Sequence, residues 1–239
     1  MRLDKLMSDL GVASRKELKQ IIKSGRVSVN GDPVREPDMK LDPENDEVAL
    51  DGRPLSYRRF RYFAVDKPEG LLTACEDKKQ KTVMDILPEQ LRKLDLFPVG
   101  RLDKDTTGLL LLTNDGEYAH KVISPKYRIE KVYYAETDGA ITNEDIALFA
   151  SGVVLRDGLH CLPAKLEAAE PSPCAACYVT VMEGKYHQVK RMLASVGKPV
   201  IHLRRLSIGN LELGSLQFDG DSCICELSQE QANLVFAEK

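Results

Sequence analysis

The hydrophobic positions at the start of the chain follow a helical period. Leucines at positions 3, 6 and 10 are spaced for one face of a helix, and Gly11 ends that pattern. Ser14 is placed to cap a second helix, whose apolar positions continue to Ile22 before Gly25 stops it. The pattern therefore predicts two short helices before Gly25.

Strand-like segments follow these helices. Residues 26–34 predict a hairpin, because the central Asn-Gly pair supplies the positive φ angles that a two-residue turn requires. Residues 48–50 and the Asp-Gly turn after them close a first unit, which we place at residues 1–55. The polar, proline-containing segment 53–59 is typical of a linker, and we place the linker between the two units at residues 56–61.

The second unit, residues 62–239, contains more predicted strands than helices. Strands are predicted at 62–65, 109–113, 131–136, 178–182 and 208–213. Helices are predicted at 82–87, 142–150 and 187–195. Because the two kinds of element do not alternate regularly, the pattern favours an α+β fold with a mixed, largely antiparallel central sheet and flanking helices.

Length and composition are those of an ordinary globular protein. Of the 239 residues, 43% are hydrophobic and 30% are charged. No apolar run approaches the roughly 20 residues that span a bilayer. The charged N-terminus also lacks the apolar stretch of a signal peptide. We therefore expect a cytoplasmic protein that does not sit in a membrane.

Charge is distributed unevenly along the chain. The net charge is −3, yet residues 1–31 carry +4 and the remainder carries −7. A second basic excess lies between residues 181 and 206, where Glu183 is the one acidic residue among six Lys and Arg. Two separate basic stretches on an acidic chain indicate a polyanion that is bound at two places.

Cysteines give little support to a metal site. The chain has six, at positions 75, 161, 174, 177, 223 and 225, and without secretory context they are best interpreted as reduced thiols. The pairs 174/177 and 223/225 together offer four thiolates, but the second pair is too close for the usual zinc ligand spacing. We expect no metal.

The first unit resembles the S4 RNA-binding domain, in which two short helices and a hairpin present basic residues to structured RNA. The resemblance rests on Arg-Leu-Asp-Lys at 2–5, Ser-Arg at 14–15 and the hairpin at 25–31. Taken by charge alone, the same residues fit a small helical cap whose basic side chains are merely solvated. The resemblance instead implies phosphate contacts, which position a protein without reading sequence, by Arg2, Lys5, Arg15, Lys19 and Arg26.

One loop concentrates the polar chemistry of the second unit. Residues 100–109, Gly-Arg-Leu-Asp-Lys-Asp-Thr-Thr-Gly-Leu, combine two acidic, two basic and two hydroxyl side chains directly ahead of an apolar run. A polar loop that leads into a buried strand can hold a charged group rigidly at a cleft. By composition alone, the loop also fits an ordinary turn held by an ion pair between Arg101 and Asp105.

This loop, with further segments in the same order, resembles the pseudouridine synthases that act on ribosomal RNA. With the S4-like unit, the match is typical of the RsuA-like branch, which acts on the small subunit. The sequence departs from many relatives at Asp66, where they carry asparagine. The other shared segments are Lys-Pro-x-Gly at 67–70, Ser-Pro-Lys at 124–126, Lys-x-Tyr at 131–133, Glu-Gly-Lys-Tyr-His-Gln-Val-Lys-Arg-Met at 183–192 and Leu-x-Arg-x-x-Ile-Gly at 203–209.

The resemblance implies three catalytic residues, Asp103, Tyr133 and Lys190. The reaction breaks the N-glycosidic bond of a uridine and rejoins the uracil through carbon 5, so the resemblance implies no cofactor. An ionised carboxylate at Asp103 suits attack on the sugar, attack on the base, or loss of the ribose 2′ proton, and the sequence does not choose among these. Burial disfavours the negative charge of this carboxylate, and the positive charge of Lys190 would offset that cost.

Tyr133 would stack on the target base. Without the resemblance, an isolated strand tyrosine is more often a half-buried core residue.

Four further residues receive supporting roles from the resemblance. Arg101 would act as a wedge or clamp when the uridine is extruded from folded RNA, unless it pairs with Asp105 to fix the loop. Leu203 would pack beneath the uracil, although an ordinary core leucine would look the same in sequence. His187 and Gln188 would support the site or contact the RNA backbone.

These inferences predict an isomerase that converts one uridine of 16S, small-subunit ribosomal RNA to pseudouridine, on naked RNA or on an assembly intermediate. We expect a monomer. One alternative is a synthase for 23S, large-subunit RNA, because that branch shares the S4 domain. Another is a non-catalytic RNA-binding assembly factor, which the intact Asp103 argues against, since a buried carboxylate beside a polyanion lowers affinity.

Overall fold

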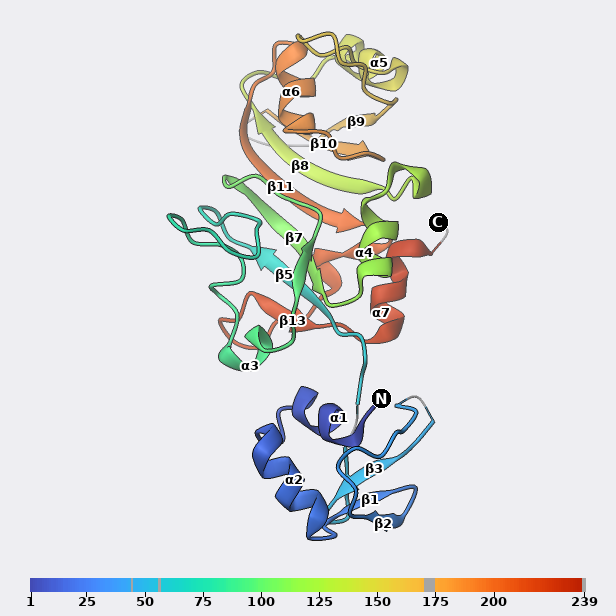
Figure 1. The fold of residues 1–239 in the computed structure, drawn as a ribbon. Coiled ribbons are helices and arrows are strands. Elements are labelled where there is room, and N and C mark those ends of the chain that lie inside the picture. Colours follow the sequence, from blue (N-terminus) through green and yellow to red (C-terminus); the bar gives the residue numbers. More distant parts are fainter. Residues whose placement is uncertain (44, 56, 170–174, 238–239) are drawn as a thin grey trace. The chain divides into compact units, whose positions relative to one another are not determined.

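The computed structural model describes residues 1–43, 45–55, 57–169 and 175–237. The chain divides into two compact units, Met1–Phe60 and Arg61–Lys239, and each is described here by itself (Figure 1). The division lies within residues 56–61, where the sequence predicts a linker.

Two short helices and a small antiparallel sheet form the N-terminal unit. The Ser14 side chain caps the second helix in a capping box with Glu17, as the sequence predicts. Asn30 and Gly31 both have positive φ and make the predicted hairpin turn. A core of leucine, isoleucine and valine lies between the helices and the sheet. The elements are α1 (Leu3–Asp9), α2 (Arg15–Lys23), β1 (Val27–Val29), β2 (Asp32–Val34), β3 (Val48–Leu50) and β4 (Arg53–Leu55), with strand order β2-β1-β3-β4.

The start of the segment expected to be a linker is a strand instead. Arg53–Leu55 forms β4, in which Pro54 lies opposite Ala49 of β3. Proline lacks an N–H but is tolerated on an edge strand, and β4 pairs only with β3 at the edge of this sheet. The prediction of a linker at residues 53–55, which rested on their polarity and on the proline, is therefore wrong.

A nine-stranded sheet forms the framework of the second unit. Its path is β13-β5-β7-β11-β8-β10-β9, with β6 added beside β7 and β12 beside β11. β7 and β11 run parallel and the other paired strands run antiparallel, so the predicted mixed, largely antiparallel sheet is confirmed. The strands are β5 (Tyr62–Lys67), β6 (Phe97–Val99), β7 (Thr106–Thr113), β8 (Lys131–Thr137), β9 (Lys165–Ala168), β10 (Ala176–Val181), β11 (Val200–Ile208), β12 (Leu211–Glu212) and β13 (Ile224–Glu226).

Helices flank this sheet in separate groups (Figure 1). α4 (Gly116–Ile123) and α7 (Gln229–Asn233) pack with β5 and β7 around one apolar cluster. α5 (Asn143–Ser151) and α6 (Gln188–Ser195) pack against β8, β9 and β10 around another, and the short α3 (Glu89–Arg92) lies near a third. Every residue of the central strand β7 is buried. Among the described residues, no helix is long and apolar enough to cross a membrane.

Two predicted elements of this unit are wrong. Residues 82–87 form turns rather than a helix, because Pro88 follows at once and disfavours helical backbone at the residue before it. The single strand expected at 208–213 is divided: β11 ends at Ile208, Gly209 turns with positive φ, and Leu211–Glu212 forms the short strand β12, which pairs back onto β11. The hydropathy pattern did not predict the full strand Val200–Ile208, because polar residues at 202, 204 and 205 interrupt its apolar positions.

Gly108 sets how closely the two parallel strands approach. It has a φ of 97°, and a Cβ placed there would lie 2.2 Å from the backbone oxygen of Arg205 on β11. A side chain at this position would therefore push β7 away from β11.

Gly108→Ala is expected to lower the free energy of unfolding of the second unit by about 3 kcal/mol, through backbone strain and overpacking. Gly116→Ala is the matched control, since a Cβ at Gly116 meets no atom within 4 Å. Urea denaturation followed by circular dichroism measures both. Equal midpoints for the two variants would contradict this account of the strand contact.

Candidate active site

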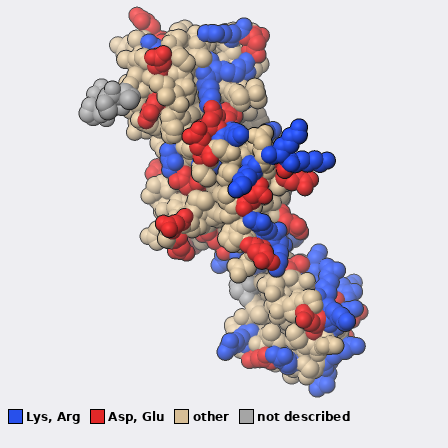
Figure 2. Space-filling model, turned by 90° about the vertical axis from the view of Figure 1, so that its left-hand side faces the viewer, with Lys and Arg blue, Asp and Glu red and all other residues tan. Residues whose placement is uncertain are grey.

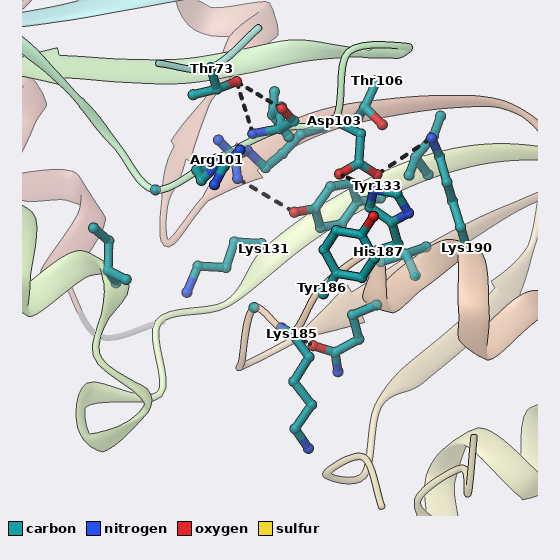
Figure 3. Close-up of a pocket in the computed structure, with 18 of the residues that line it drawn as sticks. Thr73, Arg101, Asp103, Thr106, Lys131, Tyr133, Lys185, Tyr186, His187 and Lys190 are labelled. Carbon is teal, nitrogen blue, oxygen red and sulfur yellow. Dashed lines mark hydrogen bonds and ion pairs between the residues drawn. The ribbon is translucent and has the colours of Figure 1, made fainter. Parts of the chain in front are cut away.

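A pocket of about 610 Å³ opens beside the loop that contains Asp103. This volume lies within the range of small-molecule sites and suits one nucleotide. Its walls come from six parts of the sheet unit: residues 72–73, the loop 99–106, the end of α4, the start of β8, the segment 183–190 and the end of β11. Figure 3 shows Asp103 facing Tyr133, His187 and Lys190 across this space.

The backbone of the Asp103 loop is fixed from two sides. Lys67, whose side chain is completely buried, donates through Nζ to the carbonyl oxygens of Pro68, Lys104 and Thr106. Burial lowers the pKa of Lys67 to about 8. Thr73 Oγ1 donates to the Leu102 carbonyl and accepts from the Leu102 N–H. These bonds hold both backbone neighbours of Asp103, so its carboxylate has a defined position.

Two nitrogen atoms approach the Asp103 carboxylate from the far side of the pocket. His187 Nε2 lies 3.3 Å from one oxygen and Lys190 Nζ lies 3.4 Å from the other. Lys190 also bonds Asp105 at 2.5 Å, and this bond holds the pKa of the Asp105 carboxyl below its usual value. The structure therefore brings together Asp103 and Lys190, with one lysine shared between two carboxylates.

The segment 183–188 shapes the wall that carries His187. His187 caps α6 with a left-handed φ of 48°, so the predicted helix begins one residue later, at Gln188. Gln188 is buried and donates to Glu183, while its own side-chain oxygen accepts from the Lys185 N–H. Gln188 thus bonds within the segment. The Tyr186 ring, 76% exposed, stacks on the His187 ring at 3.8 Å.

Tyr133 and Leu203 lie on neighbouring strands at the floor of the pocket. Tyr133 on β8 pairs with Arg205 on β11, and its hydroxyl accepts a bond of 3.4 Å from Arg205 Nη1. Leu203, 3% exposed, lines the pocket two residues earlier on β11. Tyr134, the next residue on β8, contacts Tyr178 on β10 instead and does not line the pocket.

Arg101 lies at the pocket rim with an exposed side chain. The ion pair with Asp105 that the sequence left open is not formed within the described part of the chain, because Asp105 pairs with Lys190. Asp66, the departure from many relatives, pairs with Arg204 at 2.6 Å.

The five basic residues expected to bind RNA in the N-terminal unit fall into two groups. Arg2 pairs with Asp4, and Arg26 pairs with Asp51. The other three are exposed and have no recorded carboxylate partner within the described residues: Lys5, Arg15 and Lys19. Figure 2 shows blue Lys and Arg side chains gathered along one margin of this unit.

Three residues at or near the proposed contacts were not selected from the sequence. Lys23 continues the face of α2 that carries Arg15 and Lys19, and the four-residue spacing was a sufficient signal. Thr73 comes from a turn with no chemical motif, so only the fold places it beside Leu102. The exposed Tyr186 stood inside a matched segment and was available to sequence reasoning.

No group of three or more metal-ligating side chains occurs in the described ranges. Cys177, Cys223 and Cys225 have free thiols, and burial raises the pKa of each. Cys174, the fourth member of the zinc pattern considered above, lies outside the described residues.

Comparison with known proteins identifies the class to which this fold and pocket belong. A family model described as RNA pseudouridylate synthase matches residues 61–195, and one described as S4 domain matches residues 1–48. The chain belongs to the RNA pseudouridylate synthase family, and the predicted S4 domain is confirmed. It is therefore an isomerase that makes pseudouridine in RNA.

Individual relatives agree with this assignment over nearly the whole chain. An uncharacterized RNA pseudouridine synthase of Bacillus subtilis strain 168, YtzG, is 42% identical over 98% of each chain. Ribosomal small subunit pseudouridine synthase A of Escherichia coli strain K12 is 40% identical over 89% of this chain and 91% of its own. A crystal structure of pseudouridylate synthase is similar with a TM-score of 0.65 and 32% identity, covering 98% of this chain and 99% of the other.

The buried Lys131 supplies a test of the electrostatics of the pocket. Burial, reinforced by the charge of Arg205, lowers the pKa of Lys131 to about 8. The unfolded chain, with a lysine pKa near 10.4, binds more protons than the folded chain between these two values, so this residue adds stability as pH rises through that window. Below pH 8 both states are protonated and its contribution does not change.

Lys131→Met removes this titration. From pH 8 to pH 10, wild type is expected to gain about 2 kcal/mol of unfolding free energy relative to Lys131→Met. Urea denaturation of both proteins across this range measures the difference. A difference that stays constant with pH would show that Lys131 titrates normally.

Proposed function

We propose that this protein isomerises one uridine of small-subunit, 16S ribosomal RNA to pseudouridine, with Asp103 as the catalytic carboxylate and no cofactor. One observation carries the proposal: the Asp103 carboxylate lies in a nucleotide-sized pocket with Lys190 at 3.4 Å and His187 at 3.3 Å. Attack on the sugar, attack on the base and removal of the ribose 2′ proton all use a carboxylate as nucleophile or base. Lys190 places a positive charge beside this carboxylate.

Tyr133 and Leu203 supply the surfaces that would hold the base. An aromatic ring stacks on an extruded base with about 1 to 3 kcal/mol. Tyr133 is partly exposed toward the pocket, and Leu203 adds an apolar contact from the neighbouring strand. Arg101, exposed at the rim and two residues before Asp103, would fill the place of the extruded uridine in the RNA.

Ribosomal RNA of the small subunit is the substrate favoured by the relatives. The E. coli relative that is 40% identical over 89% of this chain is named a ribosomal small subunit pseudouridine synthase. The basic residues of the N-terminal S4 domain would contact RNA phosphates, in addition to the contacts made at the pocket. We further propose that the enzyme acts as a monomer in the cytoplasm, where ribosomal RNA is modified.

Pseudouridine mapping of ribosomal RNA tests this function. Cells that lack the gene are expected to lose one pseudouridine of the small-subunit RNA, with rescue by wild type and none by Asp103→Asn. Loss of a large-subunit pseudouridine instead would assign the chain to 23S RNA. An unchanged map, or full rescue by Asp103→Asn, would show that the protein acts as an assembly factor or that Asp103 is not catalytic.

The S4 domain makes a separate prediction about salt. Each phosphate contact contributes roughly 0.7 to 0.9 to the slope of log affinity against log salt concentration. Arg15→Gln and Lys19→Gln are each expected to lower that slope by about this amount. Arg26→Gln is the control, because Arg26 already pairs with Asp51 and is expected to change the slope less. Filter binding at several salt concentrations measures the slopes, and equal slopes for all variants and wild type would refute this RNA contact.

A further inference from the structure

Arg205 is a buried cation that has no role in the function proposed above. Its side chain is 4% exposed and lines the pocket. Nε donates to the Leu109 carbonyl at 2.7 Å, and Nη1 donates to the Tyr133 hydroxyl at 3.4 Å. Nη2 is buried and has no hydrogen-bond partner. Buried polar groups are nearly always bonded to protein or to water, so an unbonded donor on a residue that lines a pocket is a candidate contact for a ligand.

The charge of Arg205 is also uncompensated. No carboxylate pairs with it in the part of the chain that the structure describes, whereas the adjacent Arg204 pairs with Asp66. An unpaired buried charge is costly, and it persists where a ligand supplies the opposing charge. The pocket therefore contains a cation directed at something the protein itself does not provide.

Strand register places this donor beside the proposed base-stacking ring. Gly108, Arg205 and Tyr133 form one cross-strand row over β7, β11 and β8. Directly paired residues lie on the same face of a sheet. The guanidinium carbon lies 6.0 Å from the centre of the Tyr133 ring. A base stacked on Tyr133 would present an edge to this guanidinium, and a small turn of the Arg205 side chain would bring the buried Nη2 to it.

A second orphan atom lies in the neighbouring row. Thr106 pairs with Leu203 and lines the same pocket; it is 2% exposed, and its buried Oγ1 has no hydrogen-bond partner. Figure 3 shows Thr106 beside Asp103. A hydroxyl and a guanidinium that both lack partners on one face of the sheet indicate a polar ligand with several acceptor or donor atoms, as on the edge of a pyrimidine.

We propose that Arg205 Nη2 donates a hydrogen bond to a carbonyl oxygen of the target uracil and stabilises the base when it leaves the sugar. This proposal rests on the proposed function. A phosphate oxygen would satisfy the same donor, but the depth of Arg205 and its contact with Tyr133 favour the base. Cytosine carries an amino group in place of the carbonyl at C4, so contact at that position would also exclude cytosine.

The charge balance of the reaction explains the need for this cation. When the C1′–N1 bond breaks, its electron pair leaves with the uracil, and the negative charge spreads over N1 and both carbonyl oxygens. C5 then bonds to C1′, the C5 proton is lost and N1 takes up a proton, so the product has the composition of the substrate. A fixed donor in a pocket that excludes water stabilises such transient charge most effectively.

A substrate–enzyme cycle tests the contact. The RNA carries uridine, 2-thiouridine or 4-thiouridine at the mapped position, and single-turnover pseudouridine formation is measured with wild type and Arg205→Lys. With the uridine RNA, we expect Arg205→Lys to lower the single-turnover rate about 100-fold, while its affinity for the RNA stays within twofold of wild type. Replacing the contacted oxygen by sulfur should lower the rate of wild type by a factor about 10-fold larger than the factor for Arg205→Lys. Arg204→Lys, on the same strand and paired with Asp66, is the matched control and should keep the wild-type rate.

Each other outcome has a defined meaning. Equal sulfur effects in both enzymes at both positions would overturn the base contact while leaving the proposed function intact. Weaker RNA binding with an unchanged single-turnover rate would assign Arg205 to phosphate and also overturn it. A wild type that makes no pseudouridine would remove the proposed function and this proposal together.

A second measurement covers a variant that fails to fold. If Arg205→Lys melts well below wild type, the contact is tested in wild type instead, through the nitrogen NMR signals of the Arg205 guanidinium. They should shift on binding RNA with the target uridine and not on binding RNA with an abasic site there. Equal shifts with both RNAs would overturn the proposal.

Discussion

The position of the Asp103 loop depends on the buried ammonium of Lys67. Lysine is almost never fully buried unless its charge is satisfied, and here three backbone carbonyls satisfy it, two of them from the residues on either side of Asp105. Lys67 ends β5, where it pairs with Gly108 of β7, so the sheet fixes the ammonium and the ammonium fixes the loop. The position of the Asp103 backbone follows from this arrangement, and Gly108 at the same place lets β11 approach.

The charged groups around Asp103 include more cations than the two carboxylates of its loop. Lys190 lies between Asp103 and Asp105, while Arg205 and Lys131 have no carboxylate of their own within the described residues. The charge of Arg205 adds to the burial of Lys131 in lowering its pKa. A site with this excess of positive charge favours an anionic substrate and the transient charge on a departing base.

Much of the fold was predictable because its signals are local. The capping box at Ser14 and Glu17, the Asn-Gly hairpin turn and the helix after Thr142 each depend on a few adjacent residues. The strand Val200–Ile208 was missed because it contains Arg205, which lines the pocket, and Arg204, which pairs with Asp66, and hydropathy does not register such a strand. Pro54 hid β4 because edge position depends on topology.

The candidate site was predictable where it coincides with a family motif. Asp103, Tyr133 and Lys190 stand in matched segments, and the fold brings all three to one pocket. Thr73 contributes only a hydroxyl to the Leu102 backbone, a property that does not exist until the chain is folded. Arg205 stands in the matched segment 203–209, but its burial and its unbonded nitrogen appear only in the folded chain.

The central claim is that Asp103 carries out the reaction, and one measurement tests it most directly. Purified protein is incubated with unmodified small-subunit RNA, and pseudouridine is mapped for wild type, Asp103→Asn and Asp105→Asn. Because Asp105 is on the same loop and shares Lys190, it controls for loss of the ion pair. The account predicts a single modified uridine with wild type, measurable conversion with Asp105→Asn and none with Asp103→Asn. Conversion by Asp103→Asn at the wild-type rate would contradict it.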